Sequence, residues 1–422
     1  MMTQRAGIIL ASTLLSCAVA WAEPQEIASS LTLEQVVRTA LQHNPQIRAM
    51  QAKWEAAQER PVQERTLPNP TFTYKGMDAT KDYSFPNTNE KRMELEQSFP
   101  WFGKLGLRGR IAEKDAEIVH RDHQAMELEI TMQVKETYFD LYATQRSLSI
   151  TRAEQEVLKR MEDIAETRYA TGAVGQQDVL KAQTEITLLE QRLLELQQQE
   201  STLKAKLNLL MNQPTDSPLG LAVTAPAADT NSDTTKLLSI AEKGRPEIEG
   251  ARQDLARSRY ERNLMKKEFF PDYRLGVEYR NFETGDNMVM FTVGLDLPIW
   301  LSKNRAALRE ADKKLESSQA TLEAARQQTS FDVHDASYKV LTAQRTVELY
   351  TTALIPQAEA RFSASEAGYH TGKVGFLELL ESERFLLNAR VMAVVAEGNL
   401  GMQMARLERA VGATVPRMKE MK

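Results

Sequence analysis

Two spacings of hydrophobic residues divide this chain into segments of different predicted structure. Helical spacing covers most of it: between Ile186 and Leu210 the apolar residues recur at steps of three, four and seven, which is typical of a coiled-coil seam. A period of two covers a few short stretches. In NMVMFTVGLDLP, for example, Val289, Phe291 and Val293 fall on one face. The pattern therefore predicts a mainly helical protein with several short strands.

The predicted helices include some of unusual length. No proline occurs between Trp101 and Gln213, and a helix over about residues 103–169 would be about 100 Å long at 1.5 Å per residue. An average globular helix has about 11–12 residues. A second long helix is predicted over residues 302–369, with a kink at Pro356. A return helix follows each long helix, and a shorter helix is the first element of each half, over residues 32–67 and 235–270.

The same order of predicted elements occurs twice along the chain. RYATGAVGQQDVL begins at Arg168, and a near copy, GYHTGKVGFLELL, begins at Gly368. The shared turn positions are Tyr169, Thr171, Gly172, Val174 and Gly175 in the first copy and Tyr369, Thr371, Gly372, Val374 and Gly375 in the second. Similarity at a fixed spacing of about 200 residues indicates a duplicated structure. We expect each copy to form the tip of one helical hairpin, where glycine permits a sharp reversal.

The alternating segments lie before each long helix. TFTYKG and KRMELEQSFP belong to the first half, and RLGVEYRNF and NMVMFTVGLDLP belong to the second. Segments of about ten residues with one apolar face are typical of membrane barrel strands, although a half-buried soluble sheet gives the same local pattern. Four strands cannot close a barrel, and lipid cannot satisfy open sheet edges. A membrane location would therefore require several copies of the chain.

The N-terminus differs from the rest. Arg5, an apolar run over residues 6–20 and a small-x-small site ending at Ala22 predict a secretory signal peptide over residues 1–22. The only cysteine, Cys17, lies in LLSC, which also resembles a lipidation signal, so cleavage after Ala22 and lipidation of Cys17 both remain open. The predicted domains are a first repeat over 23–213, a linker over 214–234, a second repeat over 235–415 and a tail over 416–422.

Composition narrows the function classes. Charged residues make up 26% of the chain, the formal net charge is −5, and no basic block favours nucleic acid. No serine elbow, phosphate loop or supported pair of catalytic acids occurs, so the sequence predicts neither an enzyme nor a cofactor. His120 and His123 are three residues apart without a second ligand pair, so no metal site is predicted.

These features together resemble the TolC family of outer-membrane efflux proteins. The resemblance covers nearly the whole chain after residue 22, and it depends on the duplicated layout, TLEQVVRTALQHNPQI, LPNPTFTY, SFPWFGK and the paired Y-x-T-G-x-V-G tips. It implies a mainly α protein with a β-barrel portion, in which three chains with four strands each form a 12-stranded barrel above a periplasmic helical tunnel. It also implies contacts with outer-membrane lipid, a periplasmic adaptor and an inner-membrane pump.

The resemblance also implies roles for particular residues. The glycine tips would meet the adaptor, and acids just past the second tip would narrow the tunnel entrance. Glu378 and Glu381 stand at those positions, three apart on one helix face, and Asp178 follows the first tip. Each has a plainer interpretation as a solvated acid at a helix start.

The sequence also bears on the exported cargo and on two other protein classes, a periplasmic adaptor and a soluble scaffold. FPWFGKLGLR is most similar to the heavy-metal branch of the family, with drug or organic-solute export as the alternative. A periplasmic adaptor would carry one helical hairpin rather than two. A soluble coiled-coil scaffold would not need the signal peptide or the strands.

Overall fold

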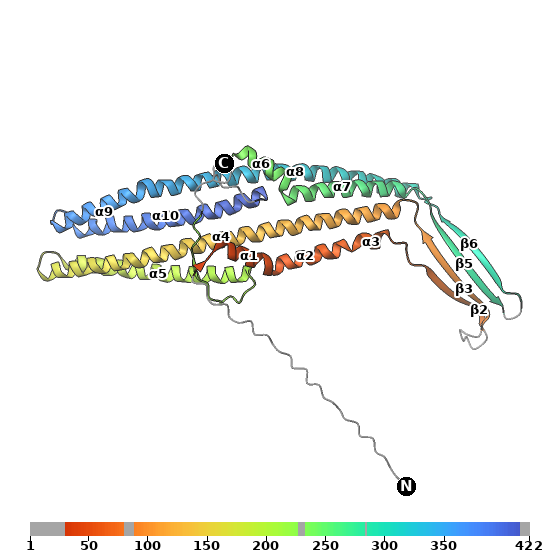
Figure 1. Cartoon of the computed structure of the whole chain (residues 1–422), viewed down its shortest axis with the longest axis horizontal. Helices are drawn as coiled ribbons and strands as arrows, with labels where there is room; N and C mark the ends of the chain where they lie inside the picture. The colour runs from red at the N-terminus through yellow and green to blue at the C-terminus, as the bar shows by residue number, and fades with distance from the viewer. Residues whose placement is uncertain (1–29, 80–87, 227–232, 283–284, 414–422) are drawn as a thin grey trace, which may run out of the picture.

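The structure, a computed structural model, describes residues 30–79, 88–226, 233–282 and 285–413. The predicted signal peptide with Cys17 and the predicted tail over 416–422 lie outside the described residues. The molecule is elongated, with one sheet at one end and the tips of two helical hairpins at the other (Figure 1).

Both halves contain the same order of elements, as the sequence predicts. The first half comprises α1 (Leu33–His43), α2 (Pro45–Gln58), α3 (Arg60–Arg65), β2 (Thr71–Ala79), β3 (Thr88–Phe99), α4 (Lys104–Ala170) and α5 (Gln176–Leu210). The second comprises α6 (Thr234–Gly244), α7 (Pro246–Lys267), β5 (Asp272–Phe282), β6 (Met288–Asp296), α8 (Leu301–Leu349), α9 (Ile355–His370) and α10 (Phe376–Val411).

The helices that open each half are not continuous, contrary to the prediction for residues 32–67 and 235–270. Asn44, with ψ 125°, separates α1 from α2, and Arg245, with ψ 123°, separates α6 from α7. Both residues precede a proline, which disfavours the helical conformation of the residue before it. A further break at Glu59 separates α2 from α3.

The second long helix also departs from the first. A π-helical turn over Tyr350–Leu354 joins α8 to α9, directly before Pro356. Proline cannot donate the regular helical hydrogen bond, and the wider turn accommodates it without a break. The predicted irregularity is therefore present, as a π-turn.

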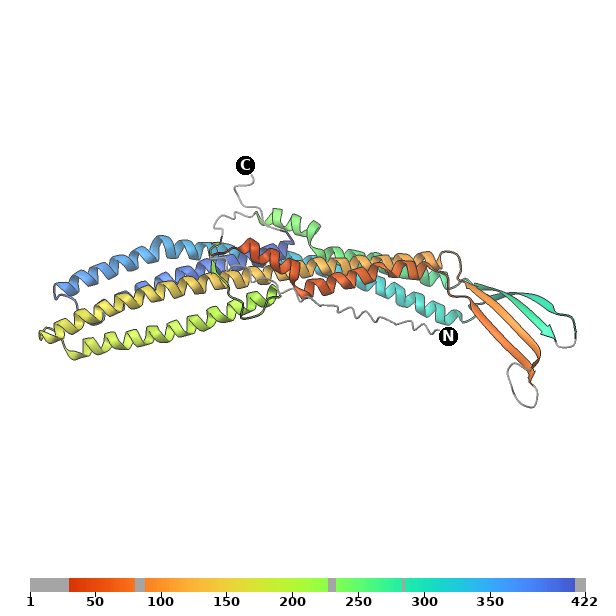
Figure 2. The same cartoon turned by 60° about the horizontal axis from the view of Figure 1, so that its bottom comes forward.

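The 67-residue helix α4 runs along most of the molecule and contacts both halves. Along one side it packs first against α2 and α3 and then against α5, and along the other first against α7 and then against α10 (Figures 1 and 2). The short helices and the return helix thus stack end to end beside the long one. No helix in the described parts of the chain has both the length and the apolar composition to cross a membrane.

The core is divided along this length. A cluster around Tyr138 joins α1, α4 and the end of α5 at the middle of the molecule. Segment 214–234, predicted as a linker, contributes β4 (Leu221–Ala222), which pairs in parallel with β1 (Ser30–Leu31). The Tyr138 hydroxyl donates to the carbonyl of Leu31 at 2.8 Å and accepts from the amide of Thr224 at 2.9 Å. The described part of the linker is therefore fixed to the bundle.

Two glycines set the distance between α4 and α10. A Cβ on Gly398 would lie 2.9 Å from the carbonyl oxygen of Phe139, and one on Gly401 would lie 2.4 Å from the Phe139 ring. Neither contact leaves room for a methyl group. Because these positions have no side chains, α4 and α10 can approach each other closely near the middle of the molecule.

The sheet joins the two halves by strands in the order β2-β3-β5-β6, all antiparallel. The register aligns Phe72, Leu95, Val277 and Phe291 in one row across the four strands. These side chains are exposed, Phe291 to 80%. One face of the sheet is thus apolar and uncovered within the chain, and β2 and β6 are each paired on one side only.

Candidate functional site at the paired tips

The two tips share one backbone turn. In the first, the amide of Gly172 donates to the carbonyl of Tyr169 at 2.9 Å, and the amide of Ala173 donates to that of Arg168, also at 2.9 Å. In the second, Gly372 donates to Tyr369 and Lys373 donates to Gly368. This pair of bonds closes a helix C-terminus and requires a left-handed residue, and φ is +74° at Gly172 and +73° at Gly372.

The other predicted tip residues serve the turn in different ways. The hydroxyl of Thr171 donates to the carbonyl of Arg168 at 3.0 Å, and that of Thr371 donates to the carbonyl of Gly368 at 3.1 Å. Gly175 and Gly375 are the N-cap residues of α5 and α10, with φ of −84° and −76°. Because other residues adopt these angles readily, only the first glycine of each tip is needed for the reversal.

The tips differ sharply in how their tyrosines are placed. Tyr369 is 3% exposed and belongs to a cluster in which residues of α4 and α5 pack against α9 and α10. Tyr169, the equivalent residue, is 47% exposed. The second tip therefore contributes to a core shared by both hairpins, whereas the tyrosine of the first tip faces outward.

Arg168 connects the two tips. Its guanidinium donates to the carbonyls of Tyr369 at 3.0 Å and His370 at 3.2 Å, and it lies 4.3 Å from the centre of the Tyr369 ring. This clamp between the tips was not predicted from the sequence. The signal was present, because the residue aligned with Arg168 is Gly368, the one clear loss of a side chain in an otherwise similar motif.

At Gly368 a side chain has no space. A Cβ there would lie 2.4 Å from a methyl group of Val374, so the predicted tip residue Val374 packs directly onto this glycine. A side chain at position 368 would therefore require Val374 to move.

The three predicted entrance acids lie just past the turns, in different surroundings. Asp178 lies in the first turn of α5, 3.6 Å from Lys181, and its side chain is largely covered. Glu378 and Glu381 lie in the first two turns of α10 and are exposed. The structure brings none of the three into an ion pair with another helical hairpin. An ion pair between the two hairpins does occur near the tips, where the guanidinium of Arg384 on α10 lies 3.3 Å from the carboxylate of Glu185 on α5. The sequence did not indicate this pair.

Two acids are buried deeper between the hairpins. Glu154 of α4 is 5% exposed, and burial raises its pKa to about 7 despite the nearby charges of Arg390 and Arg160. Glu383 of α10 is also buried, and neither of its carboxylate oxygens has a hydrogen-bond partner among the described residues. Charged groups are costly in such positions unless they are paired. The charged forms of these two acids are therefore unfavourable in this part of the bundle.

A cavity of about 260 Å³ opens beside the second tip. It lies between α4 and α9 and is lined by apolar groups such as Ile164 and Phe362 together with Arg160, Glu366 and His370. The Tyr369 hydroxyl is buried without a hydrogen-bond partner in the described structure. Within the described residues, no group of three or more His, Cys, Asp or Glu side chains is arranged to hold a metal ion.

Comparison with known proteins matches both repeats. The family model described as outer membrane efflux protein matches residues 36–213 and, separately, residues 237–413. The cobalt-zinc-cadmium resistance protein CzcC of Cupriavidus metallidurans is 22% identical over 390 residues, which cover 92% of each chain. The pyoverdine export outer membrane protein OpmQ of Pseudomonas aeruginosa is 23% identical over 354 residues, which cover 80% of this chain and 72% of OpmQ.

The fold has counterparts among solved structures. The transmembrane channel CusC superposes with a TM-score of 0.78 at 19% identity, over 90% of this chain and 92% of CusC. The shared architecture thus extends over the sheet, the middle of the molecule and both hairpins.

Proposed function

This chain belongs to the outer membrane efflux protein family, and on that premise we propose that three copies form a passive exit duct without enzymatic activity. In this assembly the sheets close into a 12-stranded barrel in the outer membrane, and the helices form a tunnel through the periplasm. The tips face a periplasmic adaptor and an inner-membrane pump, which supplies the cargo.

The state of the sheet carries this proposal. Strands β2 and β6 each have one unpaired edge within the chain, and the rows through Leu95 and Val277 leave an apolar face uncovered. An unpaired edge cannot be satisfied in lipid. Pairing β6 of one copy with β2 of the next removes every edge, and three sheets of four strands give an even-numbered barrel within the known size range.

The opposite face of the sheet fits the wall of an aqueous channel. Glu94 and Glu278 are register partners there, and the next row places Arg92 beside Arg280. Ion pairs join these rows, since Arg280 lies 2.5 Å from Glu278. Barrel strands alternate between apolar residues outside and polar residues inside. A charged inner wall beside an apolar outer one follows that rule.

At the other end of the tunnel, we assign the two turns to adaptor contact and the acids to the entrance. Thr171, Gly172 and Gly175 and their counterparts in the second tip are exposed, whereas Val174 and Val374 are half-buried and Tyr369 is buried. Three chains would therefore present six exposed turns in a ring. Glu378 and Glu381 would contribute six carboxylates near the axis, with Asp178 in a lesser role. Such a ring attracts cations.

For the cargo, the similarity to CzcC over 92% of both chains favours divalent heavy-metal cations. The similarity to OpmQ keeps export of an organic solute as the second candidate. An acidic entrance suits a cationic cargo better than an anionic chelate.

The assembly can be tested by a disulfide between neighbouring sheets. Thr73 of β2 and Met290 of β6 lie in the same row but are separated by three strand spacings, about 14 Å, too far for a disulfide within one chain. A closed barrel staggers the register of neighbouring strands, so Thr71→Cys, Thr73→Cys and Lys75→Cys should each be combined with a cysteine at Met288, Met290, Thr292, Gly294 or Asp296 of β6, which lie on the same face. At least one pair should give a covalent trimer, and monomers or dimers only across the whole set would contradict the closed barrel.

The cargo can be tested in a strain that lacks this gene. Restoring the gene should lower the sensitivity of the strain to cobalt, zinc and cadmium salts, and should leave its sensitivity to organic chelators and dyes unchanged. The reverse result would transfer the assignment to organic-solute export while leaving the duct itself intact.

A further inference from the structure

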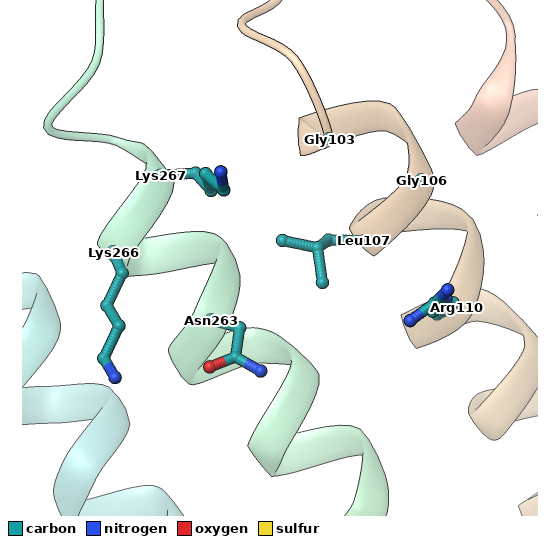
Figure 3. A pocket seen from close by; sticks show the side chains of 7 residues that line it. All are labelled: Gly103, Gly106, Leu107, Arg110, Asn263, Lys266 and Lys267. Carbon is teal, nitrogen blue, oxygen red and sulfur yellow. The ribbon is translucent and has the colours of Figure 1, made fainter.

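A basic cavity lies at the opposite end of the tunnel from the tips, directly beneath the sheet. It has a volume of about 450 Å³ and opens between the start of α4 and the end of α7. Figure 3 shows Lys267 and Asn263 of α7 extending into the space toward α4, with Gly103 and Gly106 on the facing turn and Arg110 one turn further along. Lys266 lies at the edge of the cavity with its side chain directed away from α4, and none of the lining residues is acidic.

The cations of this cavity are available for a ligand. Arg110, Lys266 and Lys267 form no ion pair with any described acid. The nearby acids are already used, since Glu268 lies 3.0 Å and Asp272 lies 2.9 Å from the ammonium group of the buried Lys104. Lys267 approaches the cavity from α7 and Arg110 from α4, where its guanidinium lies 5.7 Å from the centre of the Tyr260 ring. Two cations on facing helices without a described counter-charge favour an anion of the size of a phosphate ester.

A chain of aromatic contacts links this cavity to the apolar face of the sheet. The ammonium of Lys267 lies 5.6 Å from the centre of the Phe270 ring, which stacks on Trp101 at 5.3 Å. From Trp101 the contacts continue through Phe102 to Tyr273, which is in the same row as Leu295. Aromatic residues gather where barrels meet the membrane–water interface. The cavity therefore lies one side-chain layer below the level at which lipid headgroups would stand.

We propose that this cavity binds the phosphate of an anionic glycerophospholipid in the periplasmic leaflet of the outer membrane, with its acyl chains along the apolar sheet face. Lys267 pairs with the phosphate from α7, and Arg110 does so from α4. The Asn263 amide donates to an ester or glycerol oxygen. Gly106 supplies the space, because a Cβ added there would meet no atom within 4 Å.

The position of the cavity suggests why such a ligand matters. It lies on the α4–α7 contact, where the first repeat of the chain meets the second below the sheet. A lipid phosphate that bridges the two helices would join the repeats at the membrane surface, where like charges otherwise repel one another. Bound lipid should therefore stabilise the barrel end of the duct.

The test uses the full-length trimer in detergent, titrated with phosphatidylglycerol, phosphatidylcholine or inorganic phosphate and followed by native mass spectrometry. Phosphatidylglycerol should be retained in preference to phosphatidylcholine. Neutralising Arg110 or Lys267 to Gln should weaken its binding by about fivefold each, and Lys266→Gln should weaken it less. Gly106→Leu should abolish binding by filling the space, and Lys313→Gln, at an exposed site on α8 paired with Glu316, should change nothing.

Other results of this titration would contradict a lipid site. Equal retention of phosphatidylglycerol and phosphatidylcholine, or equal binding by all variants, would overturn the proposal. Inorganic phosphate that displaces the lipid at equal concentration would identify a free-anion site instead of a lipid site. The trimer mass in the same spectra separates these results from a failure of assembly.

Discussion

The two tips of this chain share a backbone turn and differ in almost everything attached to it. Gly172 and Gly372 have the same left-handed conformation, yet Tyr369 is buried in a core shared by both hairpins whereas Tyr169 is largely exposed. Arg168 of the first tip donates to two carbonyls of the second, and Gly368 returns no such contact. The two copies therefore share the turn, but only the second buries its tyrosine in the common core and only the first supplies the arginine that connects the tips.

The largest expected difference between the tips concerns the tyrosines. Tyr369→Ala should destabilise the second tip by about 3–5 kcal/mol, as for other buried aromatic residues, and Tyr169→Ala should cost about 0.5 kcal/mol or less. Hydrogen exchange of the tip amides measures both. Tyr369→Phe is the control, since it removes only a hydroxyl that has no partner among the described groups and should be neutral or slightly stabilising. Equal costs for the two alanine variants would refute the proposed asymmetry.

A second difference lies at the same distance before each tip tyrosine, where α4 has Glu154 and the π-turn has Leu354. Burial raises the pKa of Glu154 to about 7, so the folded protein holds a proton that the unfolded chain releases near pH 4.5. The contribution of Glu154 to the free energy of unfolding is thus fully present below about pH 4.5, and it is lost as the pH rises through 7.

Glu154→Gln should therefore stabilise the protein at pH 8, by up to about 3 kcal/mol, and should have little effect at pH 5. Melting temperatures of the trimer at the two pH values provide the measurement. Glu156→Gln, an exposed neighbour paired with Lys159, serves as the control. A gain that is the same at both pH values would show that burial does not protonate Glu154.

The shared backbone predicts one effect that should be equal at the two tips. A Cβ on Gly172 or Gly372 would meet nothing within 4 Å, so replacement by valine costs only the backbone strain, about 1–3 kcal/mol in each case. Export should fall while the amount of trimer stays near normal. Gly244→Ala, at the end of α6 away from both tips and with open space around it, should be silent. Normal export in the Gly172→Val/Gly372→Val double variant would remove the tips from the adaptor contact.

The clamp should contribute less, because Arg168 is half exposed to solvent. Arg168→Ala should loosen the second tip by about 1–2 kcal/mol through the loss of two charge-assisted hydrogen bonds, and Arg168→Lys should recover only part of this because lysine lacks the fork. Faster exchange of the amides around residue 370 would report the loosening. Arg192→Ala, which breaks an exposed pair with Glu195, is the matched control and should leave those amides unchanged.

The smallest effect on stability, and the most specific one on function, concerns the acids past the tips. The double variant Glu378→Gln/Glu381→Gln should weaken cation selectivity and block by divalent cations in single-channel recordings, because six carboxylates would leave the entrance. Asp178→Asn should do less, since this carboxylate lies beside Lys181. Unchanged selectivity in the double variant would return both glutamates to the role of solvated helix-start acids.

The sequence by itself determined the elements and their duplication, because these depend on local patterns. Hydrophobic spacing located α4 and α5, alternation located four strands with one apolar face, and the repeated Y-x-T-G-x-V-G motif located both turns. The breaks at Asn44 and Arg245 were also readable, since a proline follows each, although they were missed. The family match over both repeats confirms the assignment to outer-membrane efflux.

Only the tertiary structure decided which copies of the repeated residues meet. Whether Tyr169 or Tyr369 is buried depends on how α4 and α5 approach α9 and α10, where residues of all four helices form one cluster. Nearer the middle of the molecule, the fit of Phe139 against Gly401 is another contact between segments far apart in the chain. Likewise, Arg110 and Lys267 are ordinary surface cations in sequence, and they converge only because α4 lies beside α7. Local patterns specify how a segment folds, but close packing between distant segments depends on shapes that no single segment contains.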